Sequence, residues 1–162
     1  MKRFAGRMPG QAQGPVRFER ILVKLPPWPR GIASIRKDCF PARFVQTYAP
    51  MARHGSWVVA AVQGRKEVGY AQVVRYVGDN RICTLEEVAV EPRHRHLGLS
   101  TGLIFEAARW MREEGYETIH TCPLHDEDEQ LRERWLWSLG FRQHGSGWRA
   151  DAAELVSGAG GR

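Results

Sequence analysis

The segment Val88–Ser100 has the sequence VAVEPRHRHLGLS, and it decides how the chain around it folds. Its apolar, β-branched start predicts an extended strand, which the proline at position 92 ends. A basic turn with one glycine follows, and a helix with clear apolar periodicity begins near residue 99. The first N–H groups of a helix have no partner inside it, and the helix dipole lies behind them. We therefore expect an anion site at this turn.

Apolar periodicity on both sides of this segment predicts the remaining elements. We expect strands over residues 16–25, 57–62, 68–77, 82–90, 118–122 and 140–148, and helices starting at Pro41, at Leu99 and at Asp126. Short turns join the second to fourth strands into an antiparallel meander. The strand–helix–strand unit after residue 90 implies one parallel pairing. The order predicts an α+β fold, with a central, mostly antiparallel sheet flanked by helices.

The chain of 162 residues fits one domain. We expect a flexible leader over residues 1–15, a single domain over 16–150, and a glycine-rich, disordered tail over 151–162. Apolar runs are too short for a transmembrane helix, and no apolar stretch follows the Met-Lys-Arg start, so we expect neither a membrane span nor a signal peptide. The three widely spaced cysteines favour reduced thiols in a cytoplasmic protein.

The net charge of +6 is unevenly distributed. Residues 1–53 contain eleven Lys and Arg but only Glu19 and Asp38, which gives +9, and the remaining residues sum to −3. A basic face of this kind is often only a solvated surface that aids solubility. The alternative is that it selects an anionic partner.

The turn also resembles a known motif. Residues Arg95–Ser100, with the sequence RHLGLS, are similar to the pattern R-x-x-G-x-G/A, and the element Val90–Pro92 precedes them. This is the pyrophosphate-binding motif of the GNAT family of N-acetyltransferases. Ser100 replaces the usual Gly or Ala, but serine is small and suits a helix start. The order of elements from about Ser56 to Phe141 and the Leu139–Phe141 sequence LGF also resemble the family. The resemblance implies a GNAT-like acyl-CoA N-acyltransferase fold.

The resemblance implies acetyl-CoA as the cofactor, in the role of co-substrate. The backbone of Val88, Ala89 and Val90 would hold the pantetheine arm. The pyrophosphate would be held by the amides of Arg95, His96, Leu97, Gly98, Leu99, Ser100 and Thr101. The basic side chains of residues 93–96 would add positive charge around the phosphates.

Glu86 is the candidate catalytic base, since family members that acetylate small amines carry a glutamate four residues before the end of this strand. Strand alternation predicts that Glu86 shares a face with Val88 and Val90, and that Glu87 points to the other face. A carboxylate on a half-buried strand can have a raised pKa and accept a proton near neutrality. Glu87 and His120 are the alternatives.

The sequence departs from the family at the general acid. The tyrosine often found four residues before the glycine of LGF is Leu136 here, which cannot donate a proton. The acid is then absent, is replaced by water, or is replaced by one of three other side chains: Cys122, Ser138 and Tyr116. The missing tyrosine motivates an alternative function, a non-catalytic CoA-binding module with a degenerate acceptor site.

Three potential metal ligands, His120, Cys122 and His125, lie close together in the sequence. A structural zinc site needs four ligands and no partner pair is present elsewhere, so we expect no metal. The resemblance implies an N-acetyltransferase that moves an acetyl group to a primary amine by direct attack in a ternary complex. The candidates for the acceptor are a small molecule, a peptide and an RNA-linked amine, with an anionic acceptor among them, and a homodimer is one candidate assembly.

Overall fold

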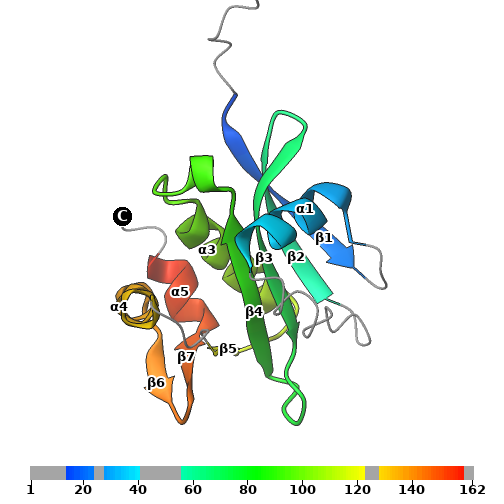
Figure 1. Ribbon diagram of the computed structural model, residues 1–162. Coiled ribbons are helices and arrows are strands. Elements are labelled where there is room, and N and C mark those ends of the chain that lie inside the picture. The colour runs from blue at the N-terminus through cyan, green and yellow to red at the C-terminus, as the bar shows by residue number, and fades with distance from the viewer. Residues whose placement is uncertain (1–13, 24–27, 41–55, 123–127, 159–162) are drawn as a thin grey trace, which may run out of the picture.

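The computed structural model describes residues 14–23, 28–40, 56–122 and 128–158 (Figure 1). These residues form one mixed sheet of seven strands with helices on both faces. The strands are β1 Val16–Val23, β2 Ser56–Gln63, β3 Lys66–Arg75, β4 Ile82–Val90, β5 Thr118–Thr121, β6 Arg142–His144 and β7 Gly147–Asp151. The helices are α1 Arg30–Cys39, α3 Leu99–Glu113, α4 Glu129–Leu139 and α5 Ala152–Gly158, and a 3₁₀ turn spans Pro92–His94. No helix in the described part of the chain is both long enough and apolar enough to cross a membrane.

The strand order confirms the predicted α+β architecture. Neighbouring strands follow the order β1-β2-β3-β4-β5-β7-β6. All pairs are antiparallel except β4 and β5, which the crossover through α3 makes parallel. The parallel ladder is short, because it joins only Ile82–Thr84 to Thr118–His120. Beyond Thr84, strand β4 runs on without β5 beside it in the described residues.

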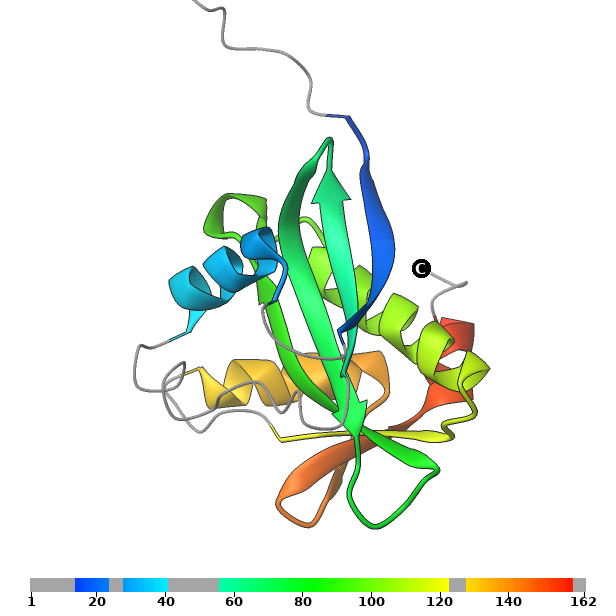
Figure 2. The ribbon, with the colours of Figure 1, turned by 90° about the vertical axis from the view of Figure 1, so that its right-hand side faces the viewer.

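Two apolar clusters lie on opposite faces of the sheet, and Figure 2 shows α1 on one face and α3 on the other. The larger cluster packs α3, α4 and α5 against the sheet through residues such as Leu103, Leu136 and Leu155. The smaller cluster packs α1 through Ile32 and Ile35. We call these two sides of the sheet the α3 face and the α1 face.

Three expectations differ from the structure. Residues 152–158 are not a disordered tail but helix α5, because Ala152 and Leu155 bury their side chains in the core. The last predicted strand is a hairpin, since Gly145 turns the chain at a φ of +61° between β6 and β7. Helix α1 was not predicted, because it offers only two buried apolar residues, Ile32 and Ile35, and contains a glycine. The helix predicted from Pro41 lies outside the described residues.

Strand β4 contains a β-bulge at Glu86. Gln72 of β3 pairs with Glu87 and the next residue, Val73, pairs with Leu85, so Glu86 has no partner in the ladder. Leu85, Val88 and Val90 pack on the α3 face, whereas Glu87 meets Arg36 and Tyr70 on the α1 face. The expectation that Glu87 points to the face opposite Val88 and Val90 is thus confirmed. The alternation that was used to place Glu86 is interrupted by the bulge at Glu86 itself.

Candidate functional site

Strands β4 and β5 separate beyond Thr84, and we call the side of residues 85–90 that β5 leaves unpaired the cleft. The Thr121 hydroxyl donates a hydrogen bond of 3.0 Å to the Leu85 carbonyl, which ends the contact between the two strands. The Glu91 N–H donates to the Val68 carbonyl at 2.9 Å. Because N–H groups alternate along a strand, those of Val88 and Val90 face the cleft, whereas that of Ala89 faces β3. Of the three residues predicted for the pantetheine arm, two thus present their backbone to the cleft.

The predicted anion-binding turn lies at the end of this cleft. His96 and Gly98 both have positive φ values, +63° and +74°, which fold the chain tightly before α3 begins at Leu99. The Gly102 N–H donates to the Gly98 carbonyl as the first hydrogen bond of the helix. The amides of residues 96–101 have no acceptor among the described residues. They form a set of free donors at a helix N-terminus, which suits a phosphate group.

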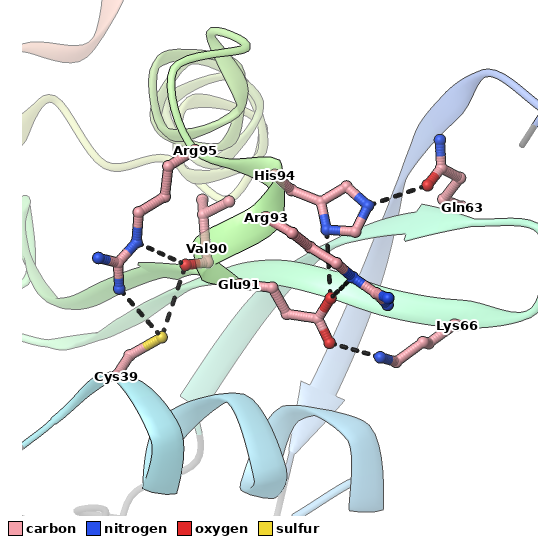
Figure 3. A network of polar contacts seen from close by, with 8 residues as sticks. All are labelled: Cys39, Gln63, Lys66, Val90, Glu91, Arg93, His94 and Arg95. Carbon is pink, nitrogen blue, oxygen red and sulfur yellow. Dashed lines mark hydrogen bonds and ion pairs between the residues drawn. The ribbon is translucent and has the colours of Figure 1, made fainter.

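A polar network ties the turn to the β2–β3 hairpin (Figure 3). Lys66 Nζ lies 2.5 Å from one oxygen of the Glu91 carboxylate, and Arg93 Nε donates to the other at 3.0 Å. His94 Nδ1 lies 3.2 Å from Glu91, and its Nε2 lies 3.0 Å from the Gln63 side-chain oxygen. Burial alone would raise the pKa of Glu91, but the hydrogen bonds from Lys66 and Arg93 outweigh it and leave this pKa below its usual value. The network fixes where the 3₁₀ turn leaves strand β4.

The basic side chains beside the turn are mostly engaged within the protein. Arg93 and His94 contact Glu91 and Gln63, as described above. Arg95 Nε donates to the Val90 carbonyl at 3.2 Å, and its guanidinium lies 3.7 Å from the Cys39 thiol at the end of α1 (Figure 3). Of the four basic residues 93–96, only His96 is exposed and makes no polar side-chain contact with another described residue. The free backbone amides, and not a basic cluster, are the main feature of this site.

Glu86 lies beside the cleft, at the bulge. Its side chain reaches solvent and has no hydrogen bond or ion pair within the described part of the chain. The protein atoms packed around the carboxylate remove part of its hydration, and this burial raises the pKa of Glu86 above its ordinary value. The negative charge of Glu87 raises it further. An unpaired carboxylate of this kind accepts a proton more readily than an ordinary surface glutamate.

Glu87, the first alternative base, is engaged in a buried cluster. Arg36 Nε lies 2.9 and 3.0 Å from its two carboxylate oxygens, and the Tyr70 hydroxyl donates to it at 2.6 Å. All three side chains are buried. Sequence reasoning missed Arg36 and Tyr70, although two adjacent glutamates between the apolar residues 85 and 88 break the strand alternation and signal a bulge.

His120, the second alternative base, lies on β5 and pairs with Thr84 in the ladder. Burial, together with the positive charges of Arg149 and His144, lowers its pKa. The Cys122 thiol lies 3.7 Å from His120 Nε2. His125 lies outside the described residues, and no group of three potential metal ligands occurs within them.

The side chains considered for the general acid lie in very different places. Leu136 is 4% exposed and packs in the core, which accounts for an apolar residue at that position. Tyr116 is also in the core, edge-on to Trp57, and the Ser138 hydroxyl donates to the Trp135 carbonyl within α4. Cys122 is exposed and follows β5 at the edge of the cleft. Of the three, only Cys122 lies beside the cleft.

Comparisons with known proteins agree with this geometry. Residues 23–141 match the family model described as Acetyltransferase (GNAT) family. A GNAT-family protein from Desulfovibrio desulfuricans is 17% identical, with a TM-score of 0.70, and the alignment covers 85% of this chain and 99% of that one. The E. coli protein YhbS, solved with CoA, is 18% identical, with a TM-score of 0.59 and coverage of 94% and 89%.

An IAA acetyltransferase from Bacillus cereus is 15% identical, with a TM-score of 0.61 and coverage of 85% and 99%. At these identities the structural likeness establishes the fold alone. Among curated protein sequences, none matches this chain.

Proposed function

Because the chain belongs to the GNAT family of acetyltransferases, we propose that it is an acetyl-CoA-dependent N-acetyltransferase that uses Glu86 as its base. The observation that carries the proposal is the position of Glu86. It is an unpaired carboxylate at a bulge, beside a cleft whose far end carries the free amides of residues 96–101. The acceptor is a primary amine, which attacks the thioester directly in a ternary complex.

The residues present fit acetyl-CoA. The free amides at the start of α3 would hold the pyrophosphate, and the cleft-facing backbone of Val88 and Val90 would pair with the amides of the pantetheine arm. When bound, acetyl-CoA supplies an acetyl group activated as a thioester. Solved relatives also support this assignment, since YhbS binds CoA.

Glu86 would take the proton that the acceptor ammonium must lose before it can attack. Its raised pKa makes it a better proton acceptor near neutrality than an ordinary glutamate. Cys122 or water would return a proton to the leaving thiolate, since Leu136 cannot. A CoA thiolate is a fair leaving group, so weak acid catalysis is compatible with turnover.

The test combines binding and turnover. The protein is offered acetyl-CoA with a panel of polyamine, aminoglycoside, aromatic and acidic amines, and release of the CoA thiol is followed. Glu86→Gln should lower the rate by about 100- to 1,000-fold and leave CoA affinity unchanged. Glu154→Gln, a change at an exposed residue of α5, should alter neither. A Glu86→Gln variant with the wild-type rate would remove Glu86 from the mechanism.

The second candidate function is a non-catalytic CoA-binding module, favoured by the burial of Leu136 at the usual position of the acid. In that case the protein binds CoA, and no amine in the panel releases the thiol. If CoA does not bind at all, both candidates fail.

The basic N-terminal third suggests an anionic or RNA-linked acceptor, but two of its arginines are neutralised by carboxylates outside it. Arg20 pairs with Glu106 and Glu113, and Arg36 pairs with Glu87. An anionic acceptor therefore has less support than the formal charge of +9 implies. The amine panel decides this point, because a preference for acidic amines would support an anionic acceptor.

A further inference from the structure

The buried contacts around Glu87 lie beside the proposed base, yet none of the proposed steps uses them. Arg36 reaches Glu87 from α1, with Nη2 at 2.8 Å in addition to the contacts of Nε. Tyr70 reaches it from β3, the neighbouring strand. The side chains of Arg36 and Glu87 are only 7% and 5% exposed. A buried carboxylate with this set of donors is held in one place.

These contacts favour the bulged form of strand β4 over a regular one. With the bulge, Glu87 meets Arg36 and Tyr70 on the α1 face, while Leu85 and Val88 pack on the α3 face. In a regular strand the alternation would turn the Glu87 carboxylate into the apolar core on the α3 face and turn Val88 out of it. An unpaired carboxylate is strongly disfavoured in an apolar core. The partners of Glu87 therefore select the bulge.

We propose that Arg36, Glu87 and Tyr70 form a positioning cluster that anchors the bulge in β4 and thereby holds Glu86 out of the strand pairing, beside the cleft. This inference rests on the proposed function, because it assigns the cluster to the support of Glu86 as the base. Glu87 is a positioning residue and takes no proton from the acceptor. The cluster also connects α1 to the site, since Arg36 is the only member that lies outside the sheet.

The cluster also affects the pKa of Glu86. Among the described residues, Glu87 is the charged group that acts on Glu86, and Arg36 from α1 and Tyr70 from β3 contact Glu87. Burial, followed by the charge of Glu87, raises the pKa of the Tyr70 hydroxyl, so it stays a neutral donor. Arg36 and Tyr70 hold the Glu87 carboxylate in place, and its adjacent charge adds to burial in raising the pKa of Glu86. The anchored bulge thus favours proton uptake at the proposed base.

The test follows the titration of Glu86 by carboxyl ¹³C NMR in the full-length protein, with the Glu86 signal assigned from its loss in Glu86→Gln. Replacing Glu87 by Gln keeps the side-chain shape but removes the charge. We expect the Glu86 midpoint to fall by about one pH unit, which is the order of effect that one neighbouring charge has at an intermediate effective dielectric constant. Tyr70→Phe is the matched control: it removes a hydrogen bond to Glu87 but leaves its charge, so the midpoint should stay at the wild-type value.

A second variant covers the case in which Glu87→Gln does not fold. The double variant Arg36→Gln/Glu87→Gln leaves no unpaired charge in the cluster, and its Glu86 midpoint should also fall, because the removed carboxylate is the nearer charge. A wild-type midpoint in either folded variant would overturn the inference.

The titration also separates this inference from the proposed function. A fall in the midpoint in a protein that acetylates no amine would support the cluster and refute the catalytic role. Turnover that depends on Glu86, combined with an unchanged Glu86 midpoint in Glu87→Gln, would support the catalytic role and refute the cluster.

Discussion

At the scale of single residues, Gly98 gives the sharpest test of the anion site. Its φ of +74° and the open space around it mean that Gly98→Asp introduces strain and a negative charge, but no steric clash. The charge would lie where we expect phosphate, so the increase in Tm on adding CoA should be lost. Gly145→Asp is the matched control, since Gly145 has a similar φ of +61° and equally open surroundings. A Gly98→Asp variant that keeps the full thermal shift would contradict the site.

Arg36 and Lys37 are adjacent in α1 and make a second pair for comparison. Arg36 is buried against Glu87, whereas Lys37 is exposed. Arg36→Glu would bury two carboxylates together, and we expect a loss of at least about 3–5 kcal/mol in the free energy of unfolding. Lys37→Glu should change it by less than about 0.5 kcal/mol. Urea denaturation measures both, and equal effects would mean that the Arg36–Glu87 pair does not form in solution.

The identities of the candidate site residues were easier to predict from the sequence than the directions in which their side chains point. The sequence singled out Glu86, but it did not show the bulge in β4 at this residue. Alternation has a period of two, and one inserted residue reverses every direction beyond it. The partners of Glu87 come from α1 and β3, which are distant in sequence, so only the folded chain brings them together.

At the scale of elements, helix α4 tests the interpretation of Leu136. Leu136→Ala should lower the free energy of unfolding by about 2–5 kcal/mol, because it leaves a cavity in the core. Leu136→Tyr would overpack the same site and cost about 1–3 kcal/mol, so it should not restore an acid. Thermal unfolding together with turnover measures both effects. Loss of turnover in Leu136→Ala at unchanged stability would show a direct role for this residue.

The ion pairs of Glu91 link the β2–β3 hairpin to the 3₁₀ turn, and their contribution to the stability of the fold decreases at low pH. The pKa of Glu91 is lowered in the folded protein, so its ion pairs stabilise the fold above the unfolded pKa of about 4.3. That stability is lost as the pH falls through the lower, folded pKa. Between pH 7 and pH 3, wild type should therefore lose more stability than Glu91→Gln. Parallel stability curves for the two proteins would contradict the network.

Regular elements with strong periodicity were predicted well, as with β2, β3, β4 and α3. Helix α1 and strand β6 were not, because their residues are mostly exposed or charged and leave little periodic signal. The sequence pattern also does not predict where β4 separates from β5, because this depends on where the parallel ladder between them ends.

At the scale of the whole molecule, charges that are far apart in sequence compensate one another. Arg20 of β1 bonds to Glu106 and Glu113 of α3 and lies 5.6 Å from the centre of the Trp110 ring. The basic first third and the acidic remainder therefore meet across the fold. A count along the sequence shows the imbalance but not this pairing. The predicted homodimer stays a prediction.

Helix α5 completes the core from the end of the chain. Leu155 is 1% exposed, and α5 packs against α3, the helix whose first turn carries the free amides. We expect Leu155→Ala to lower the free energy of unfolding by about 2–5 kcal/mol. Val156→Ala, at the neighbouring, partly buried position, should cost less. Urea denaturation of the two variants provides the comparison, and a larger loss in Val156→Ala would mean that α5 is rotated.

The position of α5 has a practical consequence for anyone producing the protein. Helix α5 contributes Ala152 and Leu155 to the core and packs against α3. A fusion partner joined directly after residue 158 would therefore pull on an element that backs the helix with the free amides. Shortening the gene to the end of β7 would remove part of the core. Expression designs should keep residues 152–158 and separate a fusion partner from them by a flexible glycine–serine spacer.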